Sequence, residues 1–473
     1  MNRKSMIATG AALILLLGGA AGAYFYVDHK KASEDYAAKA EKEALKLFNF
    51  DSNLVKGIDI TTADGYFNMS VDQAGDWHID ETDYPYDFPL NSYYLNVVAA
   101  SMSGLTADHK ADVKNDELAK YGLDSPVTVV CHTPDADYTV YVGNSSVTNE
   151  FSYVMLPGND TVYCIDNGTG NDLRGDISLL RNPYMLNCYD TDIVQFSLVH
   201  GDETLYDLTR VNDGNTIWAL NAPQPDAKID AITVNSILTN MVRVQTDNFE
   251  CFTKDEGELA KYGLDSPAYT FSVVTEDETF TLQFPEFDKD DENVWCYDTN
   301  TCAVYSLSMN NAAFLSGKWQ DLTVKQAMSV PFIDAVSLEM TIDGEKHTLS
   351  IDHEKQVYEY DGNEITAESS EDAAKDFEYL YASVSEIEHA DYLEDIPAKM
   401  GTPTCTFLYK LADGSERLLE LVPIDDESYW AYIDGICLGM TVSSTEIKGT
   451  NGCLTFVEKL NEDLGISADK KDE

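Results

Sequence analysis

The sequence predicts an α+β protein built from three tandem copies of one antiparallel-sheet-plus-helix unit, placed behind an N-terminal transmembrane helix. Three observations lead to this fold class. A decapeptide at residues 117–126 returns unchanged at residues 258–267. Apolar residues at helical spacing precede each decapeptide, and runs of alternating apolar and polar residues stand on both sides of it. Near the start, the uncharged residues 5–27 are numerous enough to cross a bilayer as a helix.

Residues 1–31 are expected to form an uncleaved, single-pass anchor in the cell membrane, with the body of the protein extracytoplasmic. Aromatic residues at 24–26 stand where an interfacial belt belongs, and basic residues follow them. A cleavable signal peptide is the alternative, because the small residues 21–23 fit a cleavage site. Residues 32–50 are rich in Ala, Lys and Glu and predict a helical stalk.

The decapeptide predicts a structural corner. Its Glu-Leu-Ala-Lys-Tyr favours a helix, and the Gly that follows supplies the left-handed conformation that ends one. Asp-Ser before Pro favours a turn, and Pro forces its predecessor toward extended geometry. A binding loop shared by both copies is the alternative. The corner residues singled out are Tyr121, Gly122, Leu123, Asp124 and Pro126, and Tyr262, Gly263, Leu264, Asp265 and Pro267.

The spacing of the corners defines the copies. Tyr262 follows Tyr121 at the same separation, 141 residues, at which Trp218 follows Trp77. A period this long indicates a duplicated domain. A third, degenerate copy retains Gly-Thr-Pro at residues 401–403 and has Tyr358 where the others have Trp. The expected copies are residues 51–190, 191–332 and 333–466, and the charged tail 467–473 is expected to be disordered.

Each copy is expected to run in the order hairpin, helix, corner and two further hairpins. Apolar stripes predict a helix near residues 90–98, 234–244 and 377–384. The hairpins after the corners are expected at 127–142, 269–284 and 404–422, and the last hairpins at 152–165, 294–307 and 429–438. Hairpins that flank one helix indicate a helix laid over an antiparallel sheet.

The composition is strongly acidic, with 83 acidic and 31 basic residues and a formal net charge of −52. This excludes a general nucleic-acid binder and disfavours an anionic membrane surface as partner. The simplest interpretation is that the charge keeps an exposed protein soluble.

Nine cysteines, an odd number with no C-x-x-C pair, give no support for a zinc ribbon or a thioredoxin-like site. One candidate disulfide joins Cys296 to Cys302, because a turn at residues 298–300 would place them opposite each other in a hairpin. It would require an oxidising compartment.

Signatures of catalysis or of cofactor binding are absent from the sequence. There is no G-x-S-x-G, H-E-x-x-H, Walker or dinucleotide motif, and the acidic loop 288–293 lacks the ligand spacing of a calcium hand. We therefore expect no metal and no cofactor. An aromatic and acidic stretch at residues 77–89 offers a candidate ligand surface of Trp77, Tyr84, Tyr86 and Phe88. The alternative is a loop that packs these rings on the helix below it.

The Leu-Ala-Lys-Tyr-Gly-Leu-Asp-Ser-Pro corner is followed by Tyr-x-Val-Tyr-Val-Gly ending at Gly143, then by a hairpin with Tyr153 and Tyr163. Together these resemble the family called domain of unknown function 4340, over the first two copies well and the third weakly. The resemblance implies a membrane-anchored envelope protein that is accessory to an ABC-type transport system of the gliding-motility type, with permease and ATPase subunits as partners. It brings no catalytic residues.

The expected function is that of a membrane-anchored extracytoplasmic binding or scaffold protein. An envelope glycan hydrolase, with carboxylates in a groove between copies, is the alternative, and a plain spacer stalk is a third hypothesis. Converging carboxylates with one raised pKa would favour the hydrolase. An apolar or aromatic groove without such a pair would favour the binding protein.

Overall fold

The computed structural model describes residues 42–113, 115–213, 216–288, 290–365, 371–393, 395–398 and 400–466. The expected anchor at 1–31, most of the expected stalk and the expected disordered tail lie outside these residues. Within the described part of the chain, no helix is both long and apolar enough to cross a membrane.

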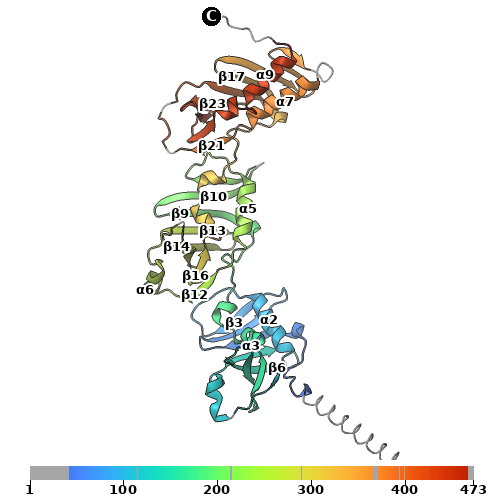
Figure 1. Ribbon diagram of the computed structural model, residues 1–473, viewed down its shortest axis with the longest axis vertical. Coiled ribbons are helices and arrows are strands. Elements are labelled where there is room, and N and C mark those ends of the chain that lie inside the picture. Colours follow the sequence, from blue (N-terminus) through green and yellow to red (C-terminus); the bar gives the residue numbers. More distant parts are fainter. Residues whose placement is uncertain are drawn as a thin grey trace, which may run out of the picture. The chain divides into compact units, whose positions relative to one another are not determined.

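Three antiparallel sheets with helices packed against them make up the fold, as predicted (Figure 1). The first sheet has the order β3-β2-β1-β5-β6-β7-β8-β4. Its strands are β1 (Gly57–Thr61), β2 (Tyr66–Val71), β3 (Trp77–Thr82), β4 (His109–Lys110), β5 (Val127–His132), β6 (Asp137–Ser145), β7 (Phe151–Met155) and β8 (Tyr163–Asp166). Its helices include α2 (Ser92–Ser103) and α3 (Asn167–Arg174).

The second sheet repeats this topology strand for strand, in the order β11-β10-β9-β13-β14-β15-β16-β12. Its strands are β9 (Ile193–His200), β10 (Glu203–Asp213), β11 (Thr216–Ala222), β12 (Asn248–Phe252), β13 (Tyr269–Thr275), β14 (Thr279–Phe284), β15 (Asn293–Asp298) and β16 (Ala303–Ser308). The matching helix is α5 (Ala231–Met241). Equal strand order in two sheets is what a duplicated domain produces.

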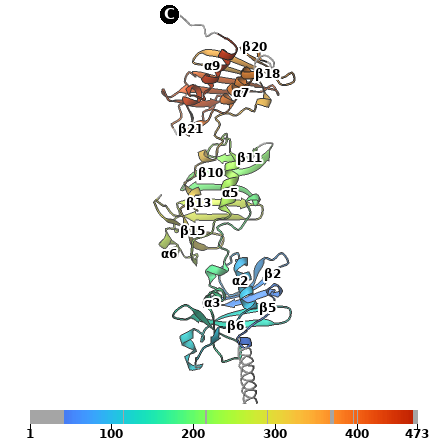
Figure 2. The same ribbon diagram turned by 45° about the vertical axis from the view of Figure 1, so that its right-hand side comes forward.

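The third sheet keeps the order and adds an edge strand, giving β20-β19-β18-β17-β22-β23-β24-β25-β21. Its strands are β17 (Ala335–Ile342), β18 (Glu345–Asp352), β19 (Val357–Tyr360), β20 (Asn363–Ile365), β21 (His389–Tyr392), β22 (Cys405–Leu411), β23 (Glu416–Pro423), β24 (Ser428–Ile433) and β25 (Met440–Ser443). Two helices, α7 (Glu371–Ser385) and α9 (Cys453–Asp463), lie side by side on one face of this sheet (Figures 1 and 2).

By their internal contacts, the residues divide into two compact units. Unit 1 comprises Met1–Asn187, Val242–Asp265 and Glu292–Ser308, and unit 2 comprises Cys188–Met241, Ser266–Asp291 and Met309–Glu473. The second sheet supplies β12, β15 and β16 to unit 1 and its other strands to unit 2. This division differs from the predicted copy boundaries, which stay a prediction.

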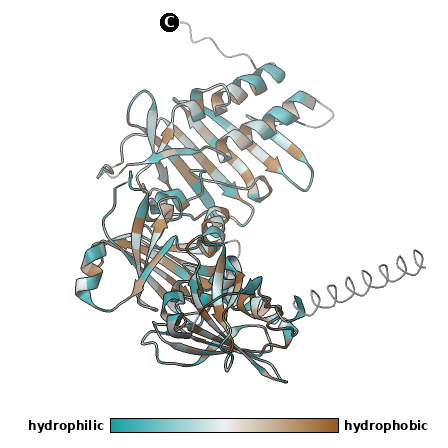
Figure 3. Cartoon of the chain, turned by 60° about the horizontal axis from the view of Figure 1, so that its bottom comes forward, coloured by the Kyte–Doolittle hydropathy of each residue, from teal (hydrophilic) through white to brown (hydrophobic). Residues whose placement is uncertain are grey.

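One face of each sheet forms the core, because apolar and polar residues alternate along the strands (Figure 3). The corresponding aromatic residues of the three copies, Trp77, Trp218 and Tyr358, each pack on a helix. Trp77 donates its indole N–H to Asn96 at 3.2 Å, and Trp218 donates to Asn235 at 3.0 Å. In the third copy Tyr358 stacks on Phe377 of α7, with ring centroids 5.1 Å apart.

Both decapeptides form a corner between a helical turn and a strand. The first turn is a 3-10 helix, Asn115–Tyr121, and the second runs through α6 (Glu256–Leu259) and the 3-10 helix η4 (Ala260–Tyr262). The glycine that follows each turn is left-handed, with φ of 67° at Gly122 and 72° at Gly263. The next leucine is buried and its amide returns to the helical turn, from Leu123 to Leu118 and from Leu264 to Leu259.

We expected the degenerate third copy to keep its corner at residues 401–403, but the structure there differs from the other two corners. Gly401 is not in the left-handed region, and the described residues 395–398 before it form no helix. The Tyr and the Leu-Asp-Ser are missing from this copy, so the hydrophobic contact that closes the other two corners has no counterpart in the sequence.

The candidate disulfide is not formed. The register of β15 and β16 pairs Cys296 with Tyr305 and Asp298 with Ala303, which leaves Cys302 in the turn. Both residues are buried free thiols. The expectation failed because the turn begins one residue later and is longer than predicted, so the two sulfurs do not face each other across the hairpin.

Candidate functional site

Trp77 does not belong to an open ligand surface. Its side chain is 6% exposed and lies beneath α2. The aromatic and acidic stretch made it a candidate, but its position in β3 places it on the covered face of the sheet.

The other three candidate aromatics, Tyr84, Tyr86 and Phe88, pack on Phe252 at the end of β12, within unit 1. Their ring centroids lie 5.9, 5.7 and 5.1 Å from that of Phe252. Phe88 is buried, and burial raises the pKa of Tyr84 to about 12. These rings cover one another and Phe252, which is a packing role like the predicted alternative, with a strand in place of the helix as partner.

The corner residues also have structural partners. Tyr121 contacts Tyr153 of β7 edge to face at 4.7 Å, and Tyr262 contacts Trp295 of β15 in the same manner at 4.7 Å. A side chain at Gly143 would meet the carbonyl oxygen of Tyr121 at 2.2 Å, so the chain passes too close for any residue larger than glycine. The corner thus anchors a helical turn on the sheet.

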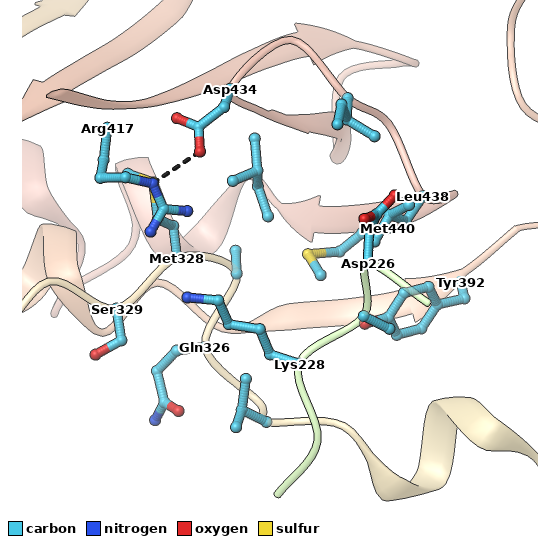
Figure 4. Close-up of a pocket in the computed structure, with 15 residues that line it drawn as sticks. Asp226, Lys228, Gln326, Met328, Ser329, Tyr392, Arg417, Asp434, Leu438 and Met440 are labelled. Atoms are coloured by element: carbon cyan, nitrogen blue, oxygen red, sulfur yellow. Dashed lines mark hydrogen bonds and ion pairs between the residues drawn. The ribbon is translucent and has the colours of Figure 1, made fainter. Parts of the chain in front are cut away.

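A cavity of about 400 Å³ in unit 2 is the strongest candidate site. We call it the basic cavity. Its lining comes from residues 226–228 before α5, residues 324–329 before β17, Tyr392 of β21, Arg417 of β23 and the turn between β24 and β25 (Figure 4). A second cavity of about 300 Å³ adjoins it and shares Tyr392 and Leu438.

The backbone fixes Lys228 at this cavity. The carbonyl of Lys228 accepts a hydrogen bond from the amide of Val324 at 3.0 Å. The amide of Asp230 donates to the carbonyl of Leu322 at 2.8 Å. This short pairing ties the two segments together, so the Lys228 side chain starts from a defined position.

The side chains of Lys228 and Arg417 point their cationic groups toward each other in the cavity (Figure 4). Arg417 donates through Nε to Asp434 Oδ2 at 2.7 Å, and the other oxygen of Asp434 accepts the amide of Leu418 at 2.9 Å. Lys228 has no ion-pair partner among the described residues. Partial burial, and then the charge of Arg417, lowers the pKa of the Lys228 amine, against the opposing effect of Asp434.

The rest of the lining is largely apolar. Met328 and Met440 are 3% and 6% exposed, and Ile433 and Leu438 also line the cavity. Tyr392 is held by an edge contact with Trp319 at 4.8 Å and donates its hydroxyl to Thr323 at 3.3 Å. The cavity therefore joins an apolar wall to a positively charged end, a combination typical of small-molecule sites.

The carboxylates that line the cavity are Asp226 and Asp434, and Asp434 is engaged by Arg417. Across the described residues, no group of three or more His, Cys, Asp or Glu side chains is placed to hold a metal ion.

Sequence reasoning missed the basic cavity. Lys228 and Arg417 lie far apart in the chain, and neither belongs to a motif. The only available signal was the scarcity of cations in so acidic a sequence, which does not say which of them converge.

Comparison with known proteins identifies one family. The model of the family described as domain of unknown function (DUF4340) matches residues 77–267 and 218–403. Among curated proteins no match is found. A DNA polymerase sliding clamp from Pseudomonas aeruginosa aligns at 8% identity over 82% of this chain and 91% of the clamp, with a TM-score of 0.14. A clamp from the same organism bound to griselimycin gives 8% identity over 86% and 94%, with a TM-score of 0.14. At such TM-scores neither clamp informs the fold or the function.

Proposed function

Because the chain belongs to the DUF4340 family, we propose that it is a membrane-anchored extracytoplasmic binding or scaffold protein, accessory to an ABC-type transport system. The anchor rests on the uncharged residues 5–27, and the transport link rests on the family resemblance. The supporting observation from the fold is the basic cavity in unit 2, which suits reversible binding.

The basic cavity favours binding over hydrolysis. Retaining and inverting glycosidases need two carboxyl groups that flank a scissile bond, one of them as the acid. In the cavity one of the two lining carboxylates, Asp434, already forms an ion pair with Arg417 and accepts a backbone amide. Its remaining lining is apolar and basic, with Met328, Met440 and Lys228. This is the groove chemistry expected of a binding protein.

Chemical crosslinking of the anchored protein in its own membranes, followed by affinity capture and mass spectrometry, tests the proposal. We expect ABC permease and ATPase subunits to be enriched over a capture from which the crosslinker is omitted. An unrelated protein with a single N-terminal anchor, captured in parallel, controls for neighbours met at random. Recovery of glycan without any transporter subunit would overturn the accessory function and favour the hydrolase.

A further inference from the structure

We infer that the basic cavity binds an organic anion with a single negatively charged head and an apolar body. Lys228 and Arg417 hold the head, and Met328, Met440 and Tyr392 receive the body. The inference rests on the proposed function as a binding protein and adds the class of ligand.

The first argument is electrostatic. Many lysines of this acidic chain stand beside a carboxylate, as Lys120 does with Glu117 at 2.5 Å and Lys410 with Glu339 at 2.6 Å. Lys228 instead faces the guanidinium of Arg417, and partial burial, followed by that charge, lowers the pKa of its amine. Two cations that converge repel each other, and an anion between them removes this repulsion.

The second argument is the hydrogen-bonding capacity left at the charged end. Asp434 occupies Nε of Arg417, and no further hydrogen bond of this guanidinium is found in the described part of the chain. Its two terminal amino groups and the ammonium of Lys228, which is an exposed residue, therefore have no acceptor in the described part of the protein and can donate to a ligand. A carboxylate offers two oxygens that fit these donors.

The third argument limits the charge of the ligand. Asp434 neutralises one of the two cations, and Asp226 also lines the cavity. Asp226 lies on the opposite side of the cavity from Arg417 (Figure 4), so the end at Lys228 and Arg417 keeps one net positive charge and has room for one negative charge. The net charge of −52 on the chain also disfavours a polyanion.

The fourth argument concerns the body of the ligand. A volume of about 400 Å³ lies within the range of small-molecule sites. The thioethers of Met328 and Met440 adapt to varied apolar shapes, and Tyr392 presents an aromatic ring whose position Trp319 and Thr323 fix. An anion without an apolar portion would leave this wall in contact with water.

A matched ligand series tests the inference on the purified full-length chain by isothermal titration calorimetry. The acid 4-phenylbutyrate, the alcohol 4-phenylbutan-1-ol and the amine 4-phenylbutylamine share one body and differ in head charge. We expect the acid to bind at least about tenfold more tightly than the alcohol, and the amine not to bind. Added salt should lower the affinity for the acid. The phosphate monoester of the same alcohol carries close to two negative charges at neutral pH, so it should bind more weakly than the acid.

Three variants locate the binding. Lys228→Gln should lower the affinity for the acid about tenfold, because it removes a charged donor. Asp434→Asn should tighten it, since it removes the competing charge and keeps an oxygen for the Leu418 amide. Asn also tolerates the positive φ of 49° at this position. Lys346→Gln, at an exposed lysine on β18, is the matched control and should leave the affinity unchanged. Circular dichroism verifies the fold of each variant.

Equal affinity for acid and alcohol, or an unchanged affinity in Lys228→Gln, would overturn the inference. Its failure is distinguishable from failure of the proposed function. If transporter subunits are captured but no member of the series binds, only the ligand assignment is wrong. If the acid binds with the expected variant pattern but no transporter subunit is captured, the accessory function is wrong and the anion site stands.

Discussion

Replacement of Gly122 by Ala tests how the corner is held to the sheet. Gly122 has φ of 67°, and a Cβ there would lie 2.5 Å from Oδ1 and 3.0 Å from the backbone N of Asn144. Gly158 has nearly the same φ, 70°, but nothing within 4 Å of such a Cβ. Gly158→Ala therefore carries only the left-handed penalty, about 1–2 kcal/mol. Gly122→Ala adds an overpacking cost of about 1–3 kcal/mol.

Hydrogen exchange read by mass spectrometry suits this comparison, because a protein with several cores does not unfold in a single step. Amides of β5 and β6 report the free energy of opening of the first sheet. We expect Gly122→Ala to lower this opening free energy more than Gly158→Ala does, and the difference should equal the overpacking cost of about 1–3 kcal/mol. Adding Asn144→Ala removes the side-chain clash, so the double variant should approach Gly158→Ala.

Equal effects of Gly122→Ala and Gly158→Ala, within about 0.5 kcal/mol, would show that the corner yields to the added methyl and that the Asn144 contact is not tight. No gain from Asn144→Ala would place the strain in the backbone instead of the side chain.

Three further predictions concern stability and thiols. Burial lowers the pKa of His132, but hydrogen bonds to Asp137 and Asp59 outweigh this, so the folded-state pKa is raised. The protonated His132 therefore stabilises the folded state fully below a pH of roughly 6.5, and this contribution is lost as the pH rises through the raised folded-state pKa. The local opening free energy of β5, measured by hydrogen exchange over a pH series and corrected for the intrinsic exchange rate, should show this fall in the wild type and not in His132→Gln. Leu264→Ala should lower the local opening free energy of the second corner by about 2–5 kcal/mol in hydrogen exchange, because Leu264 is 2% exposed, and an effect below 1 kcal/mol would contradict its packing role. Thiol titration in denaturant without reductant should count all nine cysteines as free, whereas seven would indicate a disulfide.

Local chemistry made the two decapeptide corners and the antiparallel hairpins predictable. Glycine after Glu-Leu-Ala-Lys-Tyr specifies a helix end, and Pro126 and Pro267 precede the strands that follow. The alternation of apolar residues fixed the strands in the same way, because a pleated strand has one period whatever it packs against. The family assignment followed from these same residues, since the matched segments contain both corners.

Predictions that depended on distant partners were less successful. Trp77 lies in an aromatic and acidic stretch that resembles a ligand surface, and only its neighbour Asn96 on α2 shows that it is covered. Cys296 and Cys302 are close in sequence, but the strand register separates them. In both cases the sequence supplied a side chain and not the face on which it lies.

The amino-acid sequence by itself determined the repeated unit, its corners, the acidic character and the family. These properties depend on residues that are neighbours in the chain, whose turn, helix and strand preferences act locally. Tertiary structure alone decided which side chains converge. Lys228 and Arg417 come from different copies, and they face one cavity because the segment before α5 pairs with residues 322–324 and because β23 begins beside the turn at Asp434. A cavity exists only where separate segments pack around an unfilled space, and no local pattern in the chain records it.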